Sequence, residues 1–348
     1  MARRSSLQSG VLLAVLSALA FGVATPVVAW AGRGLGPLST AALLYAGAAG
    51  AALALRLIGR RHEAGLTRRH LPRVLLVALC GGALAPTLLA WGLQRAGAAV
   101  GALLLNLEAV FTVLLARAVF REPIGGRVAV AVAAMVAGGV ALTLDIAQVT
   151  SWGVLGVVAV AGATLAWALD NTLTRPLSER DPLEVIAAKG ALGASFTGVL
   201  AVLWAEPRPS ARAAVVLLVA GAIGYGVSLR CYLLAQRRIG AGRTGSVFAL
   251  APFIGAAVAV ALGERVPGGW TFAAAALFAT GVYLHVTERH AHVHDHPPIA
   301  HDHPHRHDDG HHEHVHDPPF TGEHAHPHAH DARSHAHDHA ADIHHDHH

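Results

Sequence analysis

One carboxylic acid stands near the middle of a long apolar stretch. Glu108 lies in LLLNLEAVFTVLLARAVFRE, which runs from Leu103 to Glu122. If this stretch crosses a bilayer, an ionisable side chain at its centre costs about 2.5 to 3.5 kcal/mol on insertion scales and usually faces a cavity or a partner. Such a carboxyl group could bind a proton or a solute. A structural role, with Glu108 paired to an arginine or protonated for helix packing, stays open.

A second pair of charged residues lies farther along the chain. Asp170 is near the end of one apolar segment, and Lys189, the only lysine of the chain, is early in the next. At 1.5 Å per residue from the loop between them, both lie at a similar depth, which predicts an ion pair. The pair could be a clasp between adjacent helices, a gate or a substrate site. Lys189 could instead neutralise Glu108.

Three uncharged side chains complete the candidates for a substrate or proton pathway. Trp167 and Tyr225 lie deep in their apolar segments and could line a cavity. Asn106 is two residues from Glu108 and therefore not on the same helical face, so we expect it to join helices.

The end of the chain has a different chemistry. From His290 onward, His alternates with Asp, Glu, Pro and Ala, and most of the protein's 26 histidines lie there. Neighbouring imidazoles at His-x-His spacing can chelate a metal, and imidazole with carboxylate suits Zn, Ni, Co or Cu. With few large apolar residues the tail is predicted to be disordered, and a solubilising, pH-buffering tail is the alternative. The candidate metal ligands are His292, His294, His296, His301, His303, His305, His307, His311, His312, His314 and His316.

The composition of the whole chain indicates whether it folds in water or in a lipid bilayer. The 348 residues are 53% hydrophobic and only 14% charged, with a mean hydropathy of +0.46, which indicates an integral membrane protein. Cys80 and Cys231 both lie in apolar segments, so we expect no disulfide. The net charge of +4 does not indicate nucleic-acid binding, because the arginines lie between apolar runs.

A hydrocarbon core of roughly 30 Å requires about 20 mostly apolar residues per helix. The predicted segments that meet this length are approximately 9–31, 37–58, 72–93, 98–120, 124–145, 152–174, 183–204, 213–235, 244–263 and 268–287. The first segment is longer than the apolar core of a signal peptide, so we expect it to be retained. Arginines concentrate at the loops and helix ends on the side of the N-terminus, which predicts that both termini are cytoplasmic.

The chain also contains an internal repeat. A shift of 142 positions places Phe111 on Phe253, Glu122 on Glu264 and Gly82 on Gly224. Because each copy holds five predicted helices, an odd number, the second copy must cross the membrane in the opposite orientation. Inverted repeats of this kind are typical of secondary transporters, with the substrate site between the halves near the midplane. Glu122 and Glu264 end corresponding helices, which favours a turn or cap.

These residues carry a family resemblance. NLEAVFTVLLARAVFREPIG and FALAPFIGAAVAVALGERVP resemble the two EamA repeats of the drug/metabolite transporter superfamily, over about residues 10 to 287. The resemblance implies ten helices in two inverted five-helix bundles and alternating-access transport of a small molecule. The copies differ at the apolar stretch, where Leu250 and Pro252 of the second align with Glu108 and Val110 of the first.

We therefore predict an all-α integral membrane protein with ten transmembrane helices in two inverted five-helix repeats, residues 1–148 and 149–289, followed by a disordered His-rich cytoplasmic tail, residues 290–348. The predicted function is secondary active transport, with a proton-coupled exporter of a small organic metabolite or drug favoured. Divalent metal efflux with the tail as a capture element, and a membrane-anchored metal buffer or sensor, are the alternatives.

The chain has no His-Glu-x-x-His helix, CxxC pair or Walker loop, so we predict no enzyme and no required cofactor, although the tail can take a divalent transition metal. The expected partners are the lipid bilayer of an inner membrane, a small-molecule substrate and divalent metal ions. Nucleic acid is not expected, and a homodimer is compatible with the sequence.

Overall fold

The computed structural model describes residues 2–59, 64–120, 124–148, 150–177, 180–239, 241–265, 268–287, 291–296, 299–305, 324–330 and 333–338. Within this part of the chain, 10 helical spans are long and apolar enough to cross a membrane. They are 8–31, 37–58, 68–96, 98–119, 126–147, 151–177, 182–203, 211–236, 243–261 and 269–286. The all-helical membrane fold predicted from the sequence is confirmed.

Several spans consist of more than one helical element. In the first repeat the elements are α1 (Ala2–Ala31), α2 (Pro37–Ile58), η1 (Arg68–His70), α3 (Leu71–Val77), η2 (Ala78–Leu84), α4 (Ala85–Ala96), α5 (Ala98–Leu104), α6 (Leu107–Phe120) and α7 (Gly126–Ala147). In the second they are α8 (Ser151–Thr174), η3 (Arg175–Leu177), α9 (Pro182–Leu203), α10 (Ala211–Gly221), η4 (Ala222–Val227), α11 (Ser228–Ile239), α12 (Ala241–Phe248), α13 (Ala251–Ala261) and α14 (Gly269–Val286).

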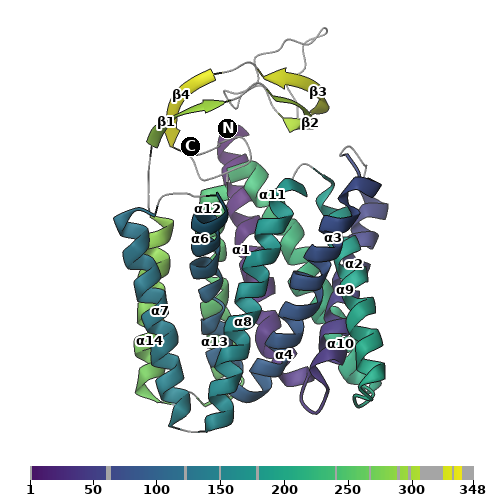
Figure 1. The fold of residues 1–348 in the computed structure, drawn as a ribbon, viewed down its shortest axis with the longest axis vertical. Coiled ribbons are helices and arrows are strands. Elements are labelled where there is room, and N and C mark those ends of the chain that lie inside the picture. Colours follow the sequence, from purple (N-terminus) through teal and green to yellow (C-terminus); the bar gives the residue numbers. More distant parts are fainter. Residues whose placement is uncertain are drawn as a thin grey trace.

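The packing of these helices relates the two repeats. α2 packs along its counterpart α9, and α7 packs along its counterpart α14 (Figure 1). α4 packs on α8 as α11 packs on α1, so each repeat inserts its first helix against the third span of the other. α14 ends at the end of the bundle where α1 begins. This exchange of contacts is what a pseudo-twofold axis between inverted repeats requires.

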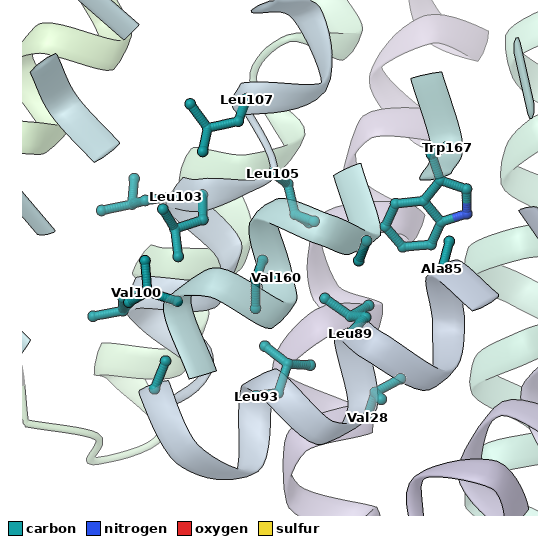
Figure 2. Packing of buried hydrophobic residues seen from close by; sticks show 14 of the residues in the cluster. Val28, Ala85, Leu89, Leu93, Val100, Leu103, Leu105, Leu107, Val160 and Trp167 are labelled. Carbon is teal, nitrogen blue, oxygen red and sulfur yellow. The ribbon is translucent and has the colours of Figure 1, made fainter. Parts of the chain in front are cut away.

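The fourth span of each repeat is broken. Leu105 and Asn106 interrupt the span between α5 and α6, and Ala249 and Leu250 interrupt the equivalent span between α12 and α13. Figure 2 shows the first break, with Leu105 and Leu107 at the edge of a packed layer. At the first break the N–H groups of Leu105, Asn106, Glu108 and Ala109 bond to carbonyls three residues earlier, so the chain turns while its backbone stays paired. Discontinuous helices of this kind often adjoin the substrate site in transporters.

The third span of each repeat contains a π-helical segment, η2 in the first and η4 in the second. The amide N–H of Ala85 bonds to the carbonyl of Cys80, and that of Ser228 to the carbonyl of Ile223, so each turn holds one extra residue. The two segments contain the equivalent glycines Gly82 and Gly224. Insertions of one residue into a helix re-aim neighbouring side chains and are frequent at functional sites.

Carboxylates of one repeat cap helices of the other. Glu264 accepts the N–H groups of Ala98 and Ala99, both at 3.0 Å, at the start of α5. By chain direction this is the end of the bundle opposite to the start of α1. A negative group at a helix N-terminus satisfies free N–H donors and the positive end of the helix dipole. The prediction that Glu264 is a cap is confirmed, whereas Glu122 lies outside the described residues.

Two further caps lie at the same end. Glu206 accepts from the N–H of Leu38 at 3.1 Å and of Ser39 at 2.8 Å, at the start of α2. Asp145 accepts from the N–H of Thr271 at 2.8 Å and from its hydroxyl at 2.6 Å, at the start of α14. These bonds tie the two repeats together at one end of the molecule.

Four short segments of the tail are described, residues 291–296, 299–305, 324–330 and 333–338. They form two antiparallel pairs of short strands, β1 (Ala291–His296) with β4 (Arg333–Asp338) and β2 (Ile299–His305) with β3 (His324–His330). The alternation of His with a second residue has the period of two that a strand requires, and an isolated two-stranded ribbon is at best marginally stable. The alternation is compatible with strand pairing in these segments, and the disorder predicted for the tail as a whole stays a prediction.

The Glu264 cap gives a stability prediction. Glu264→Ala leaves the N–H groups of Ala98 and Ala99 without their carboxylate, so we expect unfolding in mixed micelles to require about 1 to 2 kcal/mol less free energy. Arg265→Ala, at the exposed neighbouring position, is the matched control and should change this value by less than about 0.5 kcal/mol. Equal effects of both substitutions would contradict a specific capping role.

Candidate functional site

Glu108 lies in the first turn of α6, directly after the break in its span. Its side chain is half-buried, and Asn171 of α8 donates a hydrogen bond from Nδ2 to the Glu108 carboxylate at 2.8 Å. The start of a helix favours a negative group, and the amide supplies one further donor. Glu108 is thereby held between the fourth span of the first repeat and the first span of the second.

Asp170 and Lys189 form the ion pair that the sequence predicted. The Lys189 ammonium contacts the Asp170 carboxylate, joining α8 to α9. The Asp170 side chain is 3% exposed and that of Lys189 is 18% exposed. In the π-helical segment η2, a Cβ on Gly81 would collide with the Asp170 carboxylate. The absence of a side chain at Gly81 therefore leaves room for the Asp170–Lys189 ion pair.

Aromatic side chains from both repeats gather beside these charges. The ring of Tyr225 lies 5.6 Å from Phe21, 5.7 Å from Tyr45 and 6.3 Å from Trp167, centroid to centroid. Trp167 donates from Nε1 to the Tyr45 hydroxyl and to the Gly81 carbonyl, both at 3.3 Å. Figure 2 shows Trp167 beside Ala85 at the edge of the packed apolar layer.

Two more rings extend this group. Phe248 lies 5.4 Å from Phe21 and 5.1 Å from Tyr232. We call the six residues the aromatic cluster: Phe21, Tyr45, Trp167, Tyr225, Tyr232 and Phe248. It contains three of the protein's 4 tyrosines, so a residue type that is rare in this chain is concentrated at one place.

Electrostatics join the parts into one site. Glu108 interacts electrostatically with Asp170 and Lys189. It also interacts with the hydroxyls of Tyr45, Tyr225 and Tyr232. A carboxylate, an ion pair and three phenols thus lie within electrostatic range of one another between the two repeats.

The structure brings together most of the residues predicted for the pathway. Glu108, Asp170, Lys189, Trp167 and Tyr225 all belong to this site. Asn106 instead bonds within its own span. Its side-chain amide donates to the Leu103 carbonyl at 2.8 Å, at the end of α5. We expected it to join helices, and the short loop between α5 and α6 is the reason that it turns back instead.

Sequence reasoning missed Asn171, Tyr45 and Tyr232. Asn171 follows Asp170 directly, and a helix places consecutive residues about 100° apart, so the two can serve different partners. Tyrosine is scarce in this chain, but all 4 lie within predicted apolar segments, so their position in the sequence did not separate the three at the site from Tyr283.

The metal ligands predicted in the tail are only partly described. His292, His294, His296, His301, His303 and His305 lie in β1 and β2. His307, His311, His312, His314 and His316 lie outside the described residues. Within the described part of the chain, no three His, Cys, Asp or Glu side chains gather as a metal site, and Cys80 and Cys231 are free thiols.

Comparison with known proteins supports this architecture. The model of the EamA-like transporter family matches residues 8–144 and, a second time, residues 154–287. An uncharacterized transporter from Methanothermobacter thermautotrophicus is 29% identical over 205 residues, which cover 56% of this chain and 58% of that protein. The match thus spans little more than half of the relative's length. A solved crystal structure with a TM-score of 0.55 and 18% identity covers 80% of this chain and 95% of its own, which shows the shared fold.

The Asp170–Lys189 pair gives a prediction that separates a clasp from a substrate site. Asp170→Asn alone leaves Lys189 without its partner charge and should lower the free energy of unfolding by about 2 kcal/mol, less than for a fully buried pair because Lys189 is partly exposed. The double variant Asp170→Asn with Lys189→Met removes both charges and should recover most of this loss in a double-mutant cycle.

Transport by the stable double variant then decides the role of the pair. Retained solute flux in proteoliposomes would identify a clasp, and lost flux in a folded double variant would identify a part of the transport site. A double variant less stable than either single variant would contradict the ion pair itself.

Proposed function

Since the chain belongs to the EamA-like transporter family, we propose that it is a secondary active transporter of a small organic solute and that Glu108 is its coupling group. The multi-pass membrane fold and the two matches of the family model support transport as the general activity. The solute, the coupling ion and the direction are the parts that we infer from the site.

The observation that carries the proposal is the setting of Glu108. It lies at a helix break inside a membrane span, and its hydrogen bond comes from the neutral amide of Asn171. A carboxylate with a neutral partner can exchange a proton for a solute without breaking an ion pair. The surrounding groups that titrate or carry charge are Asp170, Lys189, Tyr45, Tyr225 and Tyr232, and the first two neutralise each other.

The arginine distribution supports an orientation in which both termini are cytoplasmic. In that orientation the three cross-repeat caps lie on the outer side of an inner membrane. Proton entry down its gradient would drive outward movement of the solute, so we propose an exporter.

A second candidate function is favoured by the strand register of the tail. In the β2–β3 pair, His301 is opposite His328, His303 is opposite His326 and His305 is opposite His324. Directly opposed residues of an antiparallel pair are neighbours, and imidazole is a good ligand for Zn, Ni, Co or Cu. Metal capture by the tail, for efflux or as a membrane-anchored buffer or sensor, is therefore the alternative. We favour the organic solute because the described bundle offers no gathered ligand set for a metal path.

Glu108→Gln tests the coupling role. The substitution keeps the size of the side chain and an acceptor for Asn171 but removes the titratable group, so proton-coupled flux should fall at least about tenfold while the protein stays folded. The measurement is pH-gradient-driven uptake in proteoliposomes against a panel of amines, amino acids, sugars, organic acids and divalent metals. Glu184→Gln, at the start of α9 where Glu184 pairs with Arg56, is the control and should retain flux. Undiminished flux in Glu108→Gln would remove Glu108 from the mechanism.

Removal of the tail tests the alternative. A chain ending at Arg289 should lose most of its bound Ni or Zn in equilibrium dialysis, because the histidines are removed. If the solute is organic, cells with the truncated chain should accumulate Ni, Co, Zn and Cu to the same level as cells with the full chain. Higher accumulation of one metal after truncation would instead support metal efflux.

A further inference from the structure

The charges of the site favour a solute of one sign. Lys189 is the only lysine of the chain, and its ammonium is already matched by Asp170. Arg117 lies nine residues beyond Glu108 on α6, about 13 Å away at 1.5 Å per residue. Asp170 and Lys189 are charged side chains that act electrostatically on Glu108, and their charges cancel. An ionised Glu108 then leaves one negative charge in this group of three, which attracts a cation and repels an anion.

The aromatic cluster favours an organic cation over a metal ion. The faces of Tyr, Trp and Phe rings carry negative potential, and groups of such rings bind substituted ammonium ions. Six rings from six elements, α1, α2, α8, η4, α11 and α12, pack against one another. One of them, Trp167, lies one helical turn before Asn171 on the same face of α8, and Asn171 is the residue that binds Glu108. A divalent metal would require several oxygen, nitrogen or sulfur ligands, and the described bundle gathers no three of them.

The arrangement of the polar groups also disfavours a neutral solute. The hydrogen bond to the Glu108 carboxylate comes from the neutral amide of Asn171, which does not balance the negative charge of an ionised Glu108. An unpaired carboxylate in mid-membrane is costly, and a neutral solute would not offset that cost.

From these observations we propose that the transported solute is a monovalent organic cation, a substituted ammonium whose charged group is held by the Glu108 carboxylate and the rings of the aromatic cluster. This assignment rests on the proposed function, because it names the solute class of the same site. Tyr225 is the central ring, since it contacts Phe21, Tyr45 and Trp167. Its ring, rather than its hydroxyl, supplies the attraction.

Binding of radiolabelled benzyltrimethylammonium to the purified full-length protein tests this assignment. We expect saturable binding that choline displaces and that 3,3-dimethyl-1-butanol, the neutral carbon counterpart of choline, does not. Glu108→Gln should weaken binding at least about tenfold. Tyr225→Leu should weaken it about fivefold, whereas Tyr225→Phe, which keeps the ring, should stay within about twofold of the wild type.

Phe278→Leu is the control for altered packing. Phe278 belongs to α14 and is fully buried against Gly138 of α7. It should leave binding unchanged. Absence of saturable binding, equal displacement by the neutral alcohol, or equal binding in Glu108→Gln and the wild type would overturn the cation assignment.

Flux measurements keep the two proposals apart. If the proteoliposome panel shows Glu108-dependent flux of a neutral or anionic solute and the ammonium probe does not bind, the transport function stands and the cation assignment is overturned. If the probe binds with the expected dependence on Glu108 and Tyr225 but neither it nor any panel member is moved, the cation site stands and the transport function is overturned.

Discussion

The Glu108 carboxylate is a physical constraint on the bundle, because an ionisable group inside an apolar span is costly unless its surroundings stabilise it. In an unbroken helix, Glu108 would lie in mid-helix, away from the positive end of a helix dipole. The break at Leu105 and Asn106 instead places Glu108 in the first turn of a new helix, where the positive end of the dipole favours a carboxylate. Asn171 adds one donor from α8. These two contributions offset part of the cost of about 2.5 to 3.5 kcal/mol, and a bound proton or cation can offset the rest.

The frame around this acid is symmetric, but the site is not. Both repeats have a broken fourth span and a π-helical segment in the third, and α2 packs on α9 as α7 packs on α14. Counted from the two breaks, the second residue of α6 is Glu108 and the second residue of α13 is Pro252. Proline suits the first turn of a helix, where no N–H is needed, so the second repeat has a helix-initiating residue at this point and the first repeat has a carboxylate.

Much of this architecture could be predicted from the sequence, because the bilayer makes length and hydropathy decisive. The ten spans agree with the predicted segments to within a few residues at most ends, and counting depth from the loop was enough to pair Asp170 with Lys189. The break in the fourth span was not predicted. Asn106 and Glu108 interrupt the apolar pattern without a glycine or proline to mark a stop. The π-helical segments leave no clear signal either, since an i to i−5 bond changes geometry without changing composition.

Asn171 links Glu108 to the second repeat, so binding of a proton or a cation at Glu108 could change the contact between the two repeats. Asn171 and Asp170 are consecutive residues of α8, and they bond respectively to Glu108 of the first repeat and Lys189 of the second. A ligand shifts a conformational equilibrium only by binding one state better than the other. If Glu108 binds a proton or a cation, as we propose, we expect the bond from Asn171 to weaken, while the Asp170–Lys189 pair still holds α8 to α9. On this proposal the change falls on the contact between α8 and α6, which is one of the contacts that join the two repeats and would alter if one inverted repeat moves against the other.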